Sequence, residues 1–187
     1  MGSTFEELLV RHSSPTLKGI KSGSLFTYRP ASESNFTKSL SSYDRHLAKK
    51  GVRVRSISGH GSAKRILVYR PKMIEKLLSQ VEPRCILCSL GYPVDQGHEN
   101  NVAFLMDRFK DGDGFPHEIG LFLGYPLDDV KGFIKNKGRN YTLCGLWKVY
   151  GDLGDAKEKF EEYKQCREHC LECLRQGQSV LQLILAD

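Results

Sequence analysis

Side chains that can transfer protons, attack carbon centres or bind anions occur in three separated segments of the chain. His12 precedes a Pro-containing loop that leads to Lys21, and His117 stands where a short helix is expected to begin. His and Glu act as acids and bases, Cys acts as a nucleophile, and Lys binds anions. We therefore take four residues as candidate catalytic groups and four as candidate ligand-binding groups: His12, His117, Glu118 and Cys144, and Lys21, Tyr125, Trp147 and Lys148.

Each of these residues also has a structural explanation. A helix dipole disfavours the charged form of a histidine at the helix N-terminus, so His117 suits a neutral donor or ligand. Alternatively, His117 caps its own helix and Lys148 is a solvated strand residue. Whether the three segments converge in space is a question for the tertiary structure.

Thiols form a second candidate group. Three of them share a C-x3-C-x2-C spacing near the C-terminus: Cys166, Cys170 and Cys173. This spacing resembles the four-iron-cluster motif of radical S-adenosylmethionine enzymes, but here it lies in a capped helix of a chain too short for their barrel. A less specific interpretation adds Cys85, Cys88 and His169 to these thiols, as ligands of zinc or an iron–sulfur cluster. On a helical wheel Cys170 falls within the apolar stripe, which favours a core role.

A basic β-hairpin is the third candidate. Residues 52–57 and 65–70 alternate apolar and polar side chains on either side of a Gly59-His60-Gly61 loop. Its cations are candidates for contacts with nucleic-acid phosphates: Arg53, Arg55, Lys64, Arg65 and Arg70. The hairpin lacks the aromatic spacing of an RNA-binding module, and its loop lacks the Gly-Lys-Ser/Thr ending of a phosphate loop.

The most strongly patterned stretch is FPHEIGLFLGYPLDDVKGFIKNKG, residues 115–138. Its Gly-Tyr-Pro at residues 124–126 should separate two short helices, with Asp128 and Asp129 at the positive end of the second and Gly138 after its last turn. Leu-Gly-Tyr-Pro also occurs at residues 90–93, so we expect two helix–GYP–helix elements, each second helix starting at its proline. The acidic start at Asp128 is unfavourable for a helix that reads DNA.

The remaining pattern predicts an α+β fold for residues 1–187 as a single domain. Strands are expected at residues 24–29, 52–57, 65–70 and 145–150, in a mostly antiparallel sheet of about four strands that the last one joins. The first helix should end near residue 11, because a residue before proline avoids helical geometry. A long helix with Asp155 as its N-cap should cover 155–175.

Composition bounds the class of protein. The 187 residues are 40% hydrophobic and 10% aromatic, which suits a globular core. No apolar run approaches the ~20 residues of a membrane helix, and the early acidic residues do not resemble an export signal. We therefore expect a cytoplasmic protein with reduced cysteines and no membrane partner.

Charge is unevenly distributed. Residues 1–80, the strand-rich half, hold 15 Lys and Arg against 5 Asp and Glu, whereas residues 81–187, the helical half, hold 13 against 17. The basic half indicates an anionic partner, packing of the two halves on each other, or simply a solvated surface.

Two segments, HEIGLFLGYPLDDVKGFI and CGLWKVYGD, resemble the signature of an uncharacterised family of small cytoplasmic proteins, mostly from anaerobic bacteria, known only as a domain of unknown function. ELLVRHSSPTLKGIKSGSLF near the N-terminus resembles the opening motif of the same family, so the resemblance covers nearly the whole chain. It implies no established activity. This chain has Ser13 where a cysteine is expected in that family, which puts a thiol role at that position in doubt.

The leading hypothesis is a protein that binds a small anionic ligand or redox cofactor between the His12–Lys21 loop and the His117/Lys148 region. A nucleic-acid-binding or regulatory interaction protein that uses the basic hairpin is the alternative. A cysteine-ligated metal or iron–sulfur protein is the third.

Overall fold

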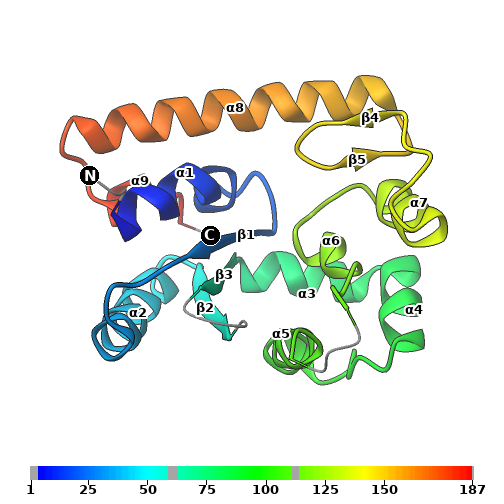
Figure 1. Cartoon of the computed structure of the whole chain (residues 1–187), viewed down its shortest axis with the longest axis horizontal. Helices are drawn as coiled ribbons and strands as arrows, with labels where there is room; N and C mark the ends of the chain where they lie inside the picture. Colours follow the sequence, from blue (N-terminus) through cyan, green and yellow to red (C-terminus); the bar gives the residue numbers. More distant parts are fainter. Residues whose placement is uncertain (1–3, 59–62, 111–113, 187) are drawn as a thin grey trace.

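The computed structural model describes residues 4–58, 63–110 and 114–186. Figure 1 shows a small sheet between two groups of helices, and a separate hairpin beneath the longest helix. The strands are β1 (Gly23–Tyr28), β2 (Arg53–Ser58), β3 (Lys64–Tyr69), β4 (Leu143–Cys144) and β5 (Lys148–Val149). The helices are α1 (Phe5–Leu17), α2 (Glu33–Ala48), α3 (Pro71–Ser79), α4 (Val81–Ser89), α5 (Gly97–Arg108), α6 (Ile119–Phe122), α7 (Leu127–Asn136), α8 (Leu153–Arg175) and α9 (Val180–Leu183).

The sheet is antiparallel, with β3 between β1 and β2. Successive side chains of a strand point to opposite faces. Ile66 and Val68 accordingly pack in a core with α1, α2, α8 and α9, whereas Leu67 and Tyr69 pack in a second core with α3 to α7. The α+β prediction is confirmed, and β3 is buried on both faces.

The strand predicted at residues 145–150 does not join this sheet. β5 pairs with β4 in a separate hairpin, in which Val149 faces Leu143, so the prediction of about four strands in one sheet is wrong. The apolar residues Trp147 and Val149 pack against Ala156 and Tyr163 of α8 in a third core. Burial beneath α8 keeps the hairpin away from the sheet.

Helix α1 runs past the expected end, to Leu17, with Pro15 inside it. Ser13 to Leu17 are all buried, and α1 packs against both α8 and β1. Pro15 removes only one backbone donor, while the Ser14 hydroxyl donates to the carbonyl of Val10 at 2.5 Å. Tertiary packing therefore outweighs the local preference against helix before proline.

Ser13 is fully buried and its hydroxyl has no hydrogen-bond partner among the described residues. We expect Ser13→Cys to raise the free energy of unfolding by about 1 kcal/mol, because a buried thiol tolerates the loss of water better than an unsatisfied hydroxyl. Urea denaturation measures the change. Ser14→Cys is the matched control, since the Ser14 hydroxyl has a partner; equal gains in both variants would contradict the explanation.

The two Gly-Tyr-Pro segments behave differently. In the second, α6 ends at Phe122 and α7 begins at Leu127, directly after the proline, as predicted. In the first, α5 begins only at Gly97 rather than at Pro93. The Asn101 amide donates to the carbonyls of Pro93 and Gly97 at 2.8 and 2.7 Å, which holds the intervening residues in a turn.

The long helix α8 begins two residues earlier than predicted. Asp152, not Asp155, is its N-cap, and the Asp152 carboxylate accepts from the backbone N–H of Asp155 at 2.8 Å. Figure 1 shows α8 along one edge of the molecule, with α1 and α9 near its C-terminal half and the β4–β5 hairpin beneath its N-terminal half. One helix therefore covers both the first and the third core.

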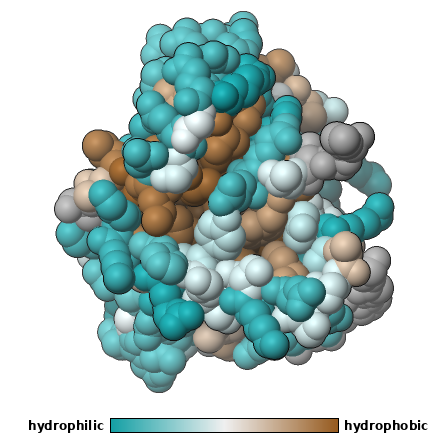
Figure 2. Space-filling model, turned by 90° about the vertical axis from the view of Figure 1, so that its left-hand side faces the viewer, coloured by the Kyte–Doolittle hydropathy of each residue, from teal (hydrophilic) through white to brown (hydrophobic). Residues whose placement is uncertain are grey.

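Apolar surface is exposed at one end of the molecule. Figure 2 looks onto this end and shows apolar residues in a hollow between hydrophilic projections. A cavity of about 290 Å³ between α2 and α9 is lined by residues that include Tyr43, His46 and Leu181. None of the candidate residues named from the sequence lines it. No helix in the described part of the chain is both long enough and apolar enough to cross a membrane.

Candidate functional site

The loop that carries Lys21 packs on the turn between α6 and α7. The Ser22 hydroxyl donates to the carbonyl of Phe122 at 3.0 Å. Gly124 adopts a φ of 75°, and a Cβ there would lie 2.8 Å from the Ser22 hydroxyl oxygen, so glycine is required for two reasons. This close approach places the Lys21 Nζ 5.5 Å from the centre of the Tyr125 ring.

A buried carboxylate orients Trp147. Asp129, in the first turn of α7, is 3% exposed, and its Oδ2 accepts from the Trp147 indole Nε1 at 2.6 Å. Its Oδ1 accepts from the backbone N–H groups of Tyr150 and Gly151 at 2.6 and 2.7 Å. Asp129 thus ties α7 to both the turn and the end of the β4–β5 hairpin.

Three aromatic rings pack against one another between the loop, the hairpin and α8. The centroids of the Trp147 and Tyr125 rings are 5.0 Å apart and their planes are inclined by 24°, so these two rings are stacked. The centroids of the Trp147 and Phe160 rings are 4.4 Å apart with an interplanar angle of 80°, so Phe160 contacts Trp147 edge-on. A Cβ at Gly145 would lie 2.2 Å from the Phe160 ring, so the hairpin approaches α8 closely because this residue has no side chain. Together the rings form an aromatic wall, and two of them, Tyr125 and Trp147, line both of two neighbouring cavities.

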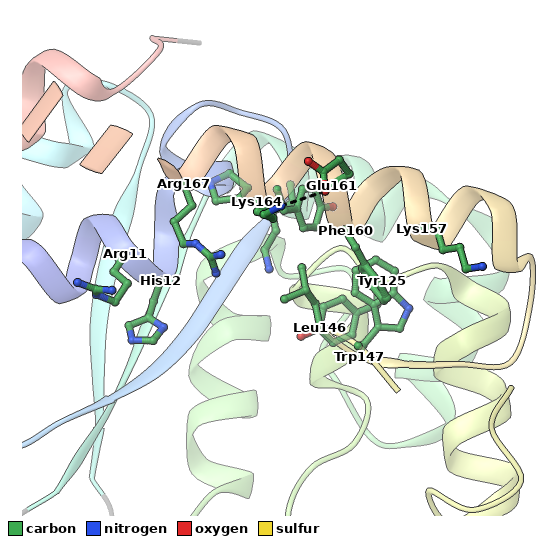
Figure 3. Close-up of a pocket in the computed structure, with 14 residues that line it drawn as sticks. Arg11, His12, Tyr125, Leu146, Trp147, Lys157, Phe160, Glu161, Lys164 and Arg167 are labelled. Atoms are coloured by element: carbon green, nitrogen blue, oxygen red, sulfur yellow. Dashed lines mark ion pairs between the residues drawn. The ribbon is translucent and has the colours of Figure 1, made fainter. Parts of the chain in front are cut away.

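The first cavity, which we call the cationic cavity, has a volume of about 470 Å³. Figure 3 shows Arg11 and His12 of α1 at one end, Tyr125, Leu146 and Trp147 at the other, and the residues of α8 along its length. The α8 residues that line it recur at each turn of the helix, which places them along one side of α8: Lys157, Phe160, Glu161, Tyr163, Lys164 and Arg167. The cavity is large enough for a metabolite-sized ligand.

Positive charge predominates around the cationic cavity. Five cationic side chains and one carboxylate line it: Arg11, Lys21, Lys157, Lys164 and Arg167, and Glu161. Arg11 pairs with Glu7 at 2.7 Å and Lys164 with Glu161 at 3.6 Å. Within the described ranges, Lys21, Lys157 and Arg167 have no carboxylate within 4 Å. A cleft with one sign of charge concentrates ligands of the opposite sign.

Burial changes the protonation of two groups in this cavity. It lowers the pKa of Lys21 to about 8, because removal from water disfavours the ammonium form. Partial burial lowers the pKa of His12, and the positive charges of Arg11 and Arg167 lower it further. The His12 ring also stacks on Phe26 at 5.3 Å. At pH 7, His12 is therefore a neutral imidazole and a fraction of Lys21 is free amine.

The second cavity, which we call the apolar cavity, shares Tyr125 and Trp147 of the aromatic wall and has a volume of about 400 Å³. His117, Cys144 and Lys148 line it, among mostly apolar residues: Leu25, Ile119, Leu123, Val130 and Phe133. Lys148 donates to the carbonyl of Gly138 at 2.7 Å and lies 4.8 Å from the Tyr141 ring. Its charge therefore contributes to the local structure.

The candidate residues from the sequence thus fall into two neighbouring cavities. His12 and Lys21 line the cationic cavity, and His117, Cys144 and Lys148 line the apolar one. Tyr125 and Trp147 line both. Glu118 lines neither: it is 3% exposed and accepts from the Tyr92 hydroxyl at 2.9 Å and from Arg108. These contacts are typical of a structural carboxylate.

The basic hairpin presents fewer unpaired charges than its sequence indicates. Arg53 and Arg55 both pair with Asp44, at 3.0 and 2.6 Å, and Lys64 pairs with Glu33 at 2.5 Å. Arg65 lies over the Phe109 ring, 5.4 Å from its centre. The loop with Gly59, His60 and Gly61 lies outside the described residues.

Arg70 was predicted to be one of the exposed cations of the basic hairpin, but the structure places it in the interior. It is 2% exposed, so it is not part of a nucleic-acid-binding surface. Its guanidinium donates to the carbonyls of Thr16, Leu17 and Leu185, each at 2.6 Å. Arg70 therefore joins the C-terminal end of α1 to the last residues of the chain.

The thiols do not assemble into a metal site. In residues 4–58, 63–110 and 114–186, no group of three or more His, Cys, Asp or Glu side chains is arranged to hold a metal ion. Cys170 is fully buried in the first core, with Cys166 and Cys173 beside it. Cys85 and Cys88 lie on α4, far from the C-terminal half of α8 (Figure 1). The geometry of the described residues therefore does not favour metal binding by these cysteines.

Sequence reasoning missed the basic face of α8 and the buried Asp129. The signal for the first was present: Lys157, Lys164 and Arg167 recur at intervals of seven and three residues, on one side of a helix whose apolar stripe was recognised. Asp129 was recognised only as a charge at a helix N-terminus. Its hydrogen bonds connect residues 18 to 22 positions apart, a separation at which local patterns carry no information.

The comparison with family models matches residues 9–184 to the family described as protein of unknown function (DUF3793). The chain belongs to this family. The match confirms the resemblance seen in the sequence, over nearly the same extent. Searches of curated proteins and of solved structures returned no match.

Proposed function

We propose that this DUF3793 protein binds a small anion that carries a planar ring, in the cationic cavity. The observation that carries the proposal is the combination of five cationic side chains with an aromatic wall around about 470 Å³. Phosphate or carboxylate oxygens would accept charge-assisted hydrogen bonds from Arg167, Lys157 and Lys21. The ring would stack beside Tyr125, Trp147 or Phe160.

The apolar cavity is a less suitable anion site, since Lys148 already donates to a backbone carbonyl. The basic hairpin is less suitable still, because three of its cations already form ion pairs with Asp44 or Glu33. In the cationic cavity the neutral His12 supplies a group for proton transfer, should the bound anion react. A redox cofactor with a phosphate and a flat ring is one ligand that meets these requirements.

The test is isothermal titration calorimetry with phenyl phosphate and cyclohexyl phosphate. We expect phenyl phosphate to bind more tightly, because only its ring is planar and aromatic. Arg167→Gln should weaken phenyl phosphate binding by about tenfold, the loss expected for one charge-assisted hydrogen bond. Arg175→Gln on the same helix is the matched control, since the exposed Arg175 pairs with Glu172 outside the cavity. Equal weakening by both variants, or no binding of either phosphate, would refute the proposal.

A further inference from the structure

Lys21 differs from the other cations of the cationic cavity in its surroundings. Its ammonium lies between two aromatic rings, 5.5 Å from the centre of Tyr125 and 5.5 Å from that of Tyr163. Lys157 and Lys164, in contrast, are exposed on the surface of α8. Among the described residues, Lys21 has no carboxylate within 4 Å, so no anion offsets the cost of burying its ammonium group.

The surroundings of Lys21 favour a free amine. Burial raises the pKa of Tyr125, and it raises that of Tyr163 to about 12, with smaller contributions from Glu162 and Tyr125. Both phenols therefore stay neutral, and neither supplies an anion that would stabilise an ammonium group. The pKa of Lys21, lowered to about 8 by burial, agrees with this geometry. A lysine desolvated in this way is a nucleophile at neutral pH.

Resting on the anion-binding function proposed above, we infer that Lys21 is an imine-forming residue, and that the bound anion carries an aldehyde or ketone group. The backbone supports such a role, because Ser22 and Gly124 fix the loop against the α6–α7 turn. The cations Arg167 and Lys157 would hold the phosphate or carboxylate while the carbonyl carbon meets the amine. The ligand class is thus an anionic carbonyl compound with a planar ring.

The reaction balances without an oxidant or reductant. The lone pair of the Lys21 Nζ forms a bond to the carbonyl carbon, and the electrons of the C=O double bond move to oxygen. The nitrogen loses one proton and the oxygen gains one, giving a carbinolamine. Protonation and departure of that hydroxyl as water, with loss of the second nitrogen proton, leaves the imine. His12 lines the same cavity and is the candidate carrier of these protons.

The experiment uses pyridoxal 5′-phosphate as the probe, because it combines an aldehyde, a phosphate and a planar ring. The full-length protein is incubated with the probe, reduced with sodium borohydride and digested, and peptide mass spectrometry quantifies the adduct at each lysine. We expect about tenfold more adduct at Lys21 than at Lys157 or Lys164, because only Lys21 lies between two aromatic rings and the other two lysines are exposed on α8. Pyridoxine 5′-phosphate, which has no carbonyl, should compete and reduce labelling of Lys21.

Lys21→Arg is the matched variant, because it keeps the charge but cannot form an imine. It should lose the adduct at position 21 while pyridoxine 5′-phosphate still raises its melting temperature. Competition on the wild-type protein answers the same question if the variant does not fold. Uniform labelling of the three lysines, or stabilisation by pyridoxine 5′-phosphate without an adduct at Lys21, overturns the inference and leaves anion binding intact. Failure of both pyridoxine and pyridoxal phosphates to bind overturns the inference and, with it, the proposed function.

Discussion

Replacing Asp129 with alanine is expected to lower the free energy of unfolding by about 3–4 kcal/mol, because one buried donor and two half-buried donors lose a charged acceptor. Those donors are the Trp147 indole and the backbone N–H groups of Tyr150 and Gly151. Trp147 is the only tryptophan of the chain, so its fluorescence reports on this site alone. We expect its emission to shift to longer wavelength as the ring leaves its place against Tyr125 and Phe160.

The controls for this prediction come from the same turn of α7. Asp128 is adjacent and exposed, so Asp128→Ala should change the unfolding free energy by no more than about 0.5 kcal/mol. Asp129→Asn keeps one acceptor oxygen and should fall between the two alanine variants. If Asp129→Ala matched Asp128→Ala in both urea denaturation and Trp147 emission, the carboxylate would not be the group that orients the aromatic wall. Phenyl phosphate binding should weaken with the displacement of Trp147.

Arg70→Ala is the second large effect, with an expected loss of about 3–5 kcal/mol in unfolding free energy. The substitution leaves a cavity and removes charge-assisted hydrogen bonds to Thr16, Leu17 and Leu185. Thr16 and Leu17 keep one backbone donor each, from Gly19 and Leu185, which limits the loss. Urea denaturation followed by circular dichroism measures it.

Arg29 provides the comparison for Arg70, since it is an exposed arginine directly after β1. Arg29→Ala should cost less than about 0.5 kcal/mol. Arg70→Lys should remain closer to Arg70→Ala than to the wild type, because a single ammonium cannot reproduce the fork of a guanidinium group. A small effect of Arg70→Ala would mean that the end of α1 and residue 185 are held together by apolar packing alone.

Local patterns predicted the elements that depend on neighbouring residues. Helix α7, with its acidic first turn and its start after Pro126, is an example, and α8 was placed to within two residues at its N-terminus. The β2–β3 hairpin followed from alternation of apolar and polar side chains. Propensity, capping and periodicity involve residues one to four positions apart, so a single sequence contains the information.

The same reasoning failed where distant contacts outweigh local preference. Helix α1 passes through Pro15 because Ser13 to Leu17 are buried. The β5 strand forms a hairpin rather than joining the sheet because Trp147 and Val149 are covered by α8. Arg70 sits in an alternating basic strand pattern and is nevertheless buried, because three carbonyls from both ends of the chain converge on it.

The sequence by itself determined the family, the α+β class, most helices and the chemical types available for a site. Only the tertiary structure decided which of those types share a cavity. His12 and Lys21 line one cavity, whereas His117, Cys144 and Lys148 line another. Glu118 and Arg70 are buried and hydrogen-bonded outside both cavities. The basic face of α8 lies beside Lys21 in the cationic cavity. The physical reason is separation along the chain: the contact that places Lys21 beside Tyr125 is made by Ser22 and Phe122, 100 residues apart, and no local pattern encodes such a pair.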